Sequence, residues 1–239
     1  DATRRWLAEM QPHIAFGDGR KLDRSAVVTL ALGPGALAKA GLPPESLETF
    51  PAAYLDGMTD PGRARLLGDE TDEPWWWKHR GPYDAAILVY GKTPRAVAAL
   101  RKTVTALLKI HGHGAPEVFP LTPVADKAYD RKEPFGFVDG TSQPVIRDTY
   151  RGLRSPDPIH LVEPGEFILG YPDNRGNLPP GPSLNALHDP QNLLPIRCDG
   201  DAGFAENVVD APREIGRNGS FLVIRQLEQD VAGFSKYCE

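Results

Sequence analysis

Cysteine is scarce in this chain of 239 residues, which contains only Cys198 and Cys238. Two cysteines provide neither a disulfide framework nor a Cys-x-x-Cys metal site, which is typical of a protein from a reducing compartment. Long apolar runs are also lacking. The run Ala85–Tyr90 has the length of a strand rather than of a membrane span, so we expect no membrane partner.

An excess of positive charge is missing as well. The 27 Lys and Arg residues stand against 32 Asp and Glu residues, which gives a net charge of -5. This balance argues against a nucleic-acid backbone binder. No signal peptide opens the chain, so we expect a cytoplasmic protein. The length allows a substantial core, in one large domain or two small ones.

The first half of the chain has a clear helical and strand pattern. Ala2, Trp6 and Met10 recur at helical spacing, and a chain that opens on a helix is expected to have an element before it. Further elements are predicted as a strand over 25–32, a helix from Pro34, short helical turns over 44–83, a strand over 83–91, a helix over 93–110 and an edge strand over 116–121.

This order is typical of an α+β fold, namely a ferredoxin-like unit with helices on one face of an antiparallel sheet and its first strand absent. Beyond Pro144 the chain is rich in Pro, Gly, Asn and Asp, which predicts long ordered loops. Strands over 166–171 and 220–227 and a helix over 228–237 would begin a second, incomplete unit. We therefore expect a domain over 1–144 and a loop-rich partial domain over 145–239.

Two local features each allow two interpretations. The run Trp75-Trp76-Trp77 can pack at the edge of the core, or it can present a surface aromatic that relays electrons or stacks on a substrate. His111 and His113 have a spacing that could bind a metal. Histidines at the end of a helix also complement its dipole, and no acidic or cysteine residue lies nearby in the sequence.

The most informative stretch runs from Phe135 to Pro144, with Asp139 between an apolar Phe-Val pair and a Gly-Thr-Ser-Gln segment. Asp-Gly is a common turn dipeptide, so a plain turn is one interpretation. The other is a carboxylate at the border of an apolar pocket, where desolvation and dipoles tune it for proton transfer.

Four segments, in order, resemble the dye-decolourising peroxidases, a family that binds haem. Gly136–Gly140 resembles the family's GxxDG loop, and Gly165–Gly176 resembles the strand and loop that open its second half. Asn218–Val231 resembles the next strand and helix, and Arg4–Leu7 is similar to the family's first helix. Together the four segments span nearly the whole chain.

The resemblance implies two ferredoxin-like halves, with haem b in the C-terminal half beneath the GxxDG loop. Asp139 would be the acid-base residue that acts on hydrogen peroxide. Organic reductants too large for the pocket would be oxidised at the surface. The residues implied to contact the cofactor are Phe137, Gly140, Thr141, Ser142 and Gln143, the last three near a propionate.

The family's axial histidine and distal arginine lie beyond the end of this chain, and no histidine follows His188. None of the six histidines occupies a matching context, namely His13, His79, His111, His113, His160 and His188. We therefore expect the chain to be inactive alone and to hold haem weakly or not at all. The iron ligand would come from a missing C-terminal portion or from another chain.

Two further interpretations stand beside this one. The chain can be a structural or interaction module, whose unpaired strand edge promotes strand addition or homo-oligomer formation. It can also be a truncated family member that has lost haem and catalysis. A hydrolase has little support, because GxSxG and HExxH are absent and Ser142 has no neighbouring histidine.

Overall fold

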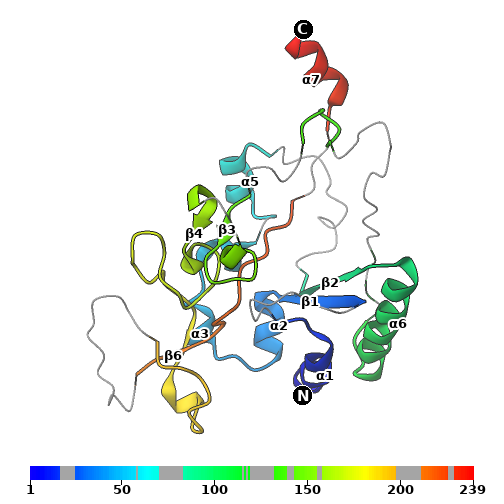
Figure 1. Cartoon of the computed structure of the whole chain (residues 1–239). Coiled ribbons are helices and arrows are strands. Elements are labelled where there is room, and N and C mark those ends of the chain that lie inside the picture. The colour runs from blue at the N-terminus through cyan, green and yellow to red at the C-terminus, as the bar shows by residue number, and fades with distance from the viewer. Residues whose placement is uncertain are drawn as a thin grey trace.

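The computed structural model describes residues 1–16, 25–57, 59–69, 83–114, 116, 118, 132–138, 143–154, 158–197, 211–225 and 229–239. Within them the chain is a mixed α and β protein with small sheets (Figure 1). The pairs β1–β2 and β5–β6 are antiparallel, and β3–β4 is parallel. The expected α+β class is confirmed at this level.

The first half contains two helices that pack on its sheet. The helix α1 (Ala2–Met10) begins at Asp1, whose carboxylate accepts from the Thr3 N–H. The longer α6 (Pro94–Ile110) begins at Thr93, whose hydroxyl accepts from the Ala96 N–H. Both helices were predicted, because their caps and apolar spacing agree.

The strands β1 (Ala26–Leu32) and β2 (Ala85–Gly91) pair in a register that sets Val28 opposite Val89. Both helices contact the same face of this sheet, as Figure 1 shows. The core between the two layers consists of Trp6, Met10, Val28 and Val104, all nearly inaccessible to solvent. Val28 is the one fully buried residue of β1 and β2, and the apolar residues beside it are partly buried.

Within the described residues, four short helices lie between β1 and β2, as predicted: α2 (Pro34–Lys39), α3 (Pro44–Leu47), α4 (Ala52–Asp56) and α5 (Pro61–Leu67). The last begins at Asp60, whose carboxylate accepts from the Arg63 N–H, and ends at Gly68 in the left-handed region at φ +73°. Glycine at this position is favourable because it adopts the left-handed conformation without strain.

Tyr54, on α4, connects this excursion to the sheet and to the second half. Its hydroxyl donates to the Leu32 carbonyl oxygen at 2.7 Å. Its ring stacks on Phe50 at 4.8 Å between centroids and meets Phe221 at 5.6 Å. Burial raises the pKa of Tyr54 to about 12. The phenol therefore remains a hydrogen-bond donor across the physiological pH range.

The second half is built from very short elements, which are β3 (Val145–Ile146), η3 (Gly152–Arg154), η4 (Pro158–His160), β4 (Leu161–Val162), η5 (Pro164–Glu166), β5 (Ser183–Leu184), η6 (Ala186–His188), β6 (Arg213–Glu214) and α7 (Val231–Cys238). The prediction of long ordered loops is confirmed for the described residues. The predicted terminal helix is also present as α7, which begins three residues later than expected and ends one residue later.

The strand predicted over 166–171 is wrong. Instead, η5 leads into a closed turn in which the Gly165 N–H donates to the Pro172 carbonyl oxygen at 2.9 Å. A Cβ at Gly165 would lie 2.2 Å from the Tyr171 carbonyl oxygen, so the close approach requires glycine. Pro164 favours a helical turn at this point, and this local preference outweighs the apolar run that follows.

The strand predicted over 220–227 is also wrong for residues 220–225, which lie in no strand. Its apolar side chains find no sheet partner in the described part of the chain. Most of the edge strand predicted over 116–121 lies outside the described residues. No described helix combines the length and the hydropathy that crossing a bilayer requires.

Candidate functional site

The structure describes two of the six predicted site residues, Phe137 and Gln143. Asp139, Gly140, Thr141 and Ser142 lie outside the described residues, and so does the Trp75–Trp77 run. The geometry of the candidate site therefore comes from the two segments that flank Asp139, which are residues 132–138 and 143–147.

The segment before Asp139 is a tight turn closed by the Glu133 side chain. One carboxylate oxygen accepts from the Phe135 N–H and the other from the Phe137 N–H, both at 2.9 Å. The Glu133 N–H donates to the Phe137 carbonyl oxygen at 2.8 Å, and Gly136 adopts φ +94°. Lys132 and Val138 form an antiparallel bridge across the turn. These contacts close the turn that directly precedes Asp139.

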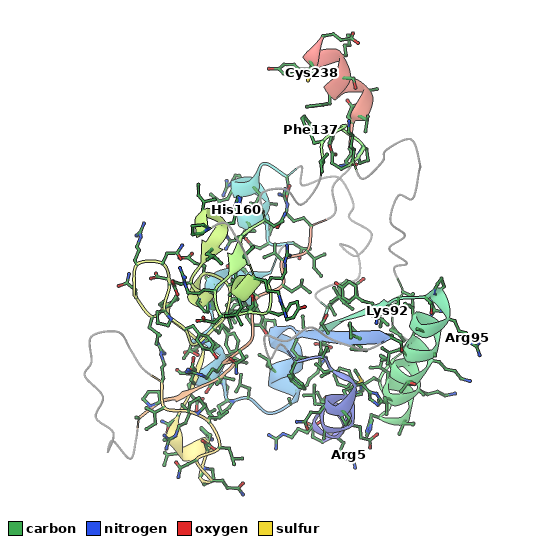
Figure 2. The ribbon with its side chains drawn as sticks, viewed as in Figure 1. Arg5, Lys92, Arg95, Phe137, His160 and Cys238 are labelled. Atoms are coloured by element: carbon green, nitrogen blue, oxygen red, sulfur yellow. The ribbon has the colours of Figure 1, made fainter. Side chains whose placement is uncertain are left out.

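The turn packs against the C-terminal helix. The rings of Phe135 and Phe137 both meet the ring of Phe234 edge to face, at 5.0 and 5.9 Å between centroids. Phe234 lies on α7, which Asp230 caps by accepting from the Gly233 N–H. Figure 2 shows Phe137 beside this helix. Edge-to-face aromatic contacts of this kind stabilise by about 0.5–1.5 kcal/mol each beyond the area that they bury.

The turn also carries apolar surface that nothing in the described chain covers. The side chain of Phe137 is 62% exposed and that of Val138 is 51% exposed. Both residues directly precede Asp139. The proton-transfer interpretation of Asp139 expects apolar surface of this kind near its carboxylate.

The segment after the loop is exposed at Gln143 and then enters β3. This strand pairs with β4, and the Arg147 guanidinium contacts the Glu163 carboxylate at 2.7 Å just beyond the pair. The Glu163 N–H in turn donates to the Asn174 side-chain oxygen at 2.7 Å. Both ends of the loop are thus held by the second half of the chain.

The described histidines occupy other places. His111 lies 3.1 Å from the Glu9 carboxylate, His113 meets the ring of Trp6 edge to face, and His188 lies 3.2 Å from the Glu45 carboxylate. His13 belongs to η1 (Gln11–His13), and His160 belongs to η4, away from Phe137 in Figure 2. Within the described residues, no three His, Cys, Asp or Glu side chains converge on a possible metal site.

His111 and His113 both pack against α1 within the described chain. The acidic partner of His111 is Glu9, which is close in space although it is distant in sequence. A cavity of about 440 Å³ opens beside them and is lined by Arg5, Ile110, His111 and Gly112. Neither this cavity nor the one of about 320 Å³ beside Arg4 and His188 is lined by the turn before Asp139.

A haem group requires an axial side-chain ligand as well as an apolar face. The turn offers the apolar face in Phe137 and Val138, but no described histidine accompanies it. Among the described residues, the turn therefore supplies an apolar face that could meet a haem ring, and none of them supplies an axial ligand beside it.

Glu133 is the residue that sequence reasoning missed. Its signal was the Glu-Pro-x-Gly spacing. The Glu133 carboxylate precedes by two and four residues the amides that donate to it, and the glycine occupies the left-handed position of the turn. No protein-family model matches this chain, and no curated protein matches it either.

Proposed function

We propose that this chain is the N-terminal portion of a haem peroxidase of the dye-decolourising type. Asp139 is its acid-base residue, which takes a proton from hydrogen peroxide and returns it to the departing oxygen. The observation that carries the proposal is the contact of Phe135 and Phe137 with Phe234. This contact brings the turn before Asp139 against a helix of the second half.

The arrangement of the first half supports the proposal. Two helices on one face of an antiparallel β1–β2 pair are the central elements of a ferredoxin-like unit. The domain over 1–144 would be such a unit, and the domain over 145–239 would be the start of a second one. That second unit would be completed by residues that follow this chain or by another chain.

The cofactor would be haem b, bound between the loop and the completing portion. Phe137 and Gly140 would contact its ring, and Thr141, Ser142 and Gln143 would donate hydrogen bonds to a propionate. Haem supplies the redox chemistry when it is bound. The part of this chain is to position the proton-transferring carboxylate, which directly follows the turn that Glu133 closes.

The test uses the complete polypeptide from the source organism that contains this chain. Asp139→Asn should leave the haem absorbance near 400 nm unchanged and slow the reaction with hydrogen peroxide by about 100-fold or more. Asp148→Asn is the matched control. It makes the same chemical change at an exposed residue with φ +63°, a backbone conformation that asparagine tolerates well.

Two results would contradict the proposal. A complete polypeptide with no haem absorbance and no peroxide-dependent dye oxidation would show that it is not a peroxidase. An Asp139→Asn variant that reacts with peroxide as fast as the Asp148→Asn control would remove the acid-base role.

A second candidate function is a structural or interaction module, either unrelated to catalysis or a truncated family member that has lost haem. The specific observation is the apolar run of Phe221, Leu222, Val223 and Ile224, whose side chains are 39%, 45%, 67% and 40% exposed. Such a run outside any sheet favours association by strand addition. The occupant would be a completing segment or a second copy of the chain.

Sedimentation of this chain distinguishes the second candidate. Val223→Lys should abolish concentration-dependent association, whereas Leu66→Lys, at an 81% exposed position on α5, should leave it unchanged. A chain that remains monomeric at high concentration, and whose complete polypeptide binds haem, would exclude the module.

A further inference from the structure

The outer face of α6 carries a single file of cations. Arg95, Lys102 and Lys109 follow one another at seven-residue spacing, and all three are exposed. Seven residues are nearly two helical turns, so successive cations lie about 10 Å apart on one side of the helix. Val104 lies on the opposite side, in the core. Figure 2 shows Arg95 directed away from the sheet.

This face is not neutralised within the described chain. Residues 85–114 contain no Asp or Glu, although acidic residues outnumber basic ones in the whole sequence. None of the three cations makes an ion pair with a described residue. The nearby carboxylate of Glu9 belongs to α1 and lies beside His111. The stripe therefore differs from an ordinary solvated helix face, where opposite charges alternate.

The placement of Arg95 has a cost for the helix itself. It lies in the first turn of α6, where the helix dipole favours negative charge, and no acidic residue compensates for it there. Arg95 therefore disfavours the start of its own helix without an ion pair to a described residue in return. It can be favourable through a partner outside the described chain.

The spaces between the cations are filled by small side chains. Ala99 and Ala106 are exposed and alternate with the cations at spacings of four and three residues. This 4-3 spacing is the pattern along which one helix packs against another. We propose that the Arg95–Lys102–Lys109 stripe docks an acidic α-helix of a protein partner, whose carboxylates repeat every seven residues.

A lipid surface or a nucleic acid would use the positive charge of α6 without regard to this spacing. Arg101 provides the means to separate these cases. It is exposed and lies one residue before Lys102, about 100° around the helix from the stripe. A docked helix should depend on Lys102 and be indifferent to Arg101, whereas a polyanion should respond to both.

The experiment measures the fluorescence anisotropy of a labelled 21-residue helical peptide with Glu at every seventh position, added to the full chain at low salt. A scrambled peptide with the same number of Glu residues, distributed around the helix, is the control. Vesicles of phosphatidylcholine with phosphatidylserine and a single-stranded oligonucleotide test the other two classes. The variants are Arg101→Gln and the triple variant Arg95→Gln, Lys102→Gln and Lys109→Gln.

We expect the triple variant to bind the regular peptide about tenfold more weakly, which is the sum of three exposed ion pairs of ordinary strength. Arg101→Gln should bind within twofold of the parent chain, and high salt should abolish binding. Equal binding of the scrambled peptide, or no binding of the regular one, would overturn the proposal. Tighter binding to vesicles or to the oligonucleotide, weakened equally by Arg101→Gln, would also overturn it.

Discussion

The two halves of this chain hold their backbones in different ways. In the first half, α1, α6 and the β1–β2 pair enclose apolar side chains such as Met10 and Val28. In the second half, the buried side chains include Asp189, Arg213 and Glu214. Regular elements satisfy their own amides and release their side chains for packing, whereas loops must find acceptors for each amide.

Carboxylates supply these acceptors. Asp189 accepts from the Leu193 and Leu194 amides at 2.9 and 3.0 Å, and Asp173 accepts from the Arg175 and Asn177 amides at 2.9 Å. Glu133 does the same in the turn before Asp139. A proline- and glycine-rich segment can therefore be ordered without strands, provided that acidic side chains lie within hydrogen-bond reach of its amides.

The largest effect is expected in the apolar half. Met10→Ala should lower the free energy of unfolding by about 2–5 kcal/mol, because Met10 is fully buried and its loss leaves a cavity. Urea denaturation followed by circular dichroism measures it. Ile110→Ala, at a 70% exposed position on α6, is the control and should cost less than 1 kcal/mol. Equal losses for the two variants would show that α1 is not packed as described.

The second prediction concerns how the stability of the second half depends on pH. Hydrogen bonds from the Leu194 and Leu193 amides lower the pKa of the Asp189 carboxyl, and Arg213 adds to this. Because the folded state favours the charged form, the stabilisation from Asp189 is present above about pH 4 and is lost as the pH falls below that. Asp189→Asn should remove this pH dependence and speed hydrogen exchange at the Leu193 and Leu194 amides.

The control for Asp189 is Asp56→Asn, at an exposed position at the end of α4. It should leave the acid dependence of exchange in the second half unchanged. Amides of β1 and β2 should exchange at parental rates in both variants. If Asp189→Asn disturbs the β1–β2 amides as much as those of Leu193 and Leu194, the two halves do not differ as proposed.

The third effect concerns the connection between the halves. Tyr54→Phe removes the hydrogen bond to the Leu32 carbonyl oxygen and keeps the ring contacts with Phe50 and Phe221. The free energy of unfolding should fall by about 1 kcal/mol. Because folding raises the pKa of Tyr54, stabilisation from the phenol is present below about pH 10 and is lost between about pH 10 and 12. Tyr54→Phe should lack that alkaline loss, and an unchanged alkaline profile would contradict this role.

The smallest global effect is expected at the turn before Asp139. Glu133→Gln keeps one acceptor oxygen of the two that hold the Phe135 and Phe137 amides. Unfolding should change by less than about 0.5 kcal/mol, because the turn lies outside the main core. Hydrogen exchange at one of the two amides should accelerate. Glu48→Gln, exposed at the end of α3, should alter neither amide; equal acceleration there would contradict the Glu133 contacts.

Prediction from the sequence was most successful where local signals agree with one another. The caps Asp1 and Thr93, the apolar spacing of α6 and the glycine stop at Gly68 each act within a few residues. It failed at 166–171, where a closed turn requires Gly165 to approach the Tyr171 carbonyl oxygen. An apolar run predicts burial, but a strand forms only if a neighbouring strand is available.

At the candidate site, too, some features follow from the sequence and others only from the tertiary structure. The sequence by itself determined the GxxDG pattern with Asp139, the helices α1 and α6 and the cation spacing on α6, because these depend on neighbours along the chain. Only the tertiary structure decided that Phe135 and Phe137 meet Phe234 and that His111 meets Glu9. The aromatic and histidine contacts join residues distant in sequence, and no local pattern records which distant side chains will meet.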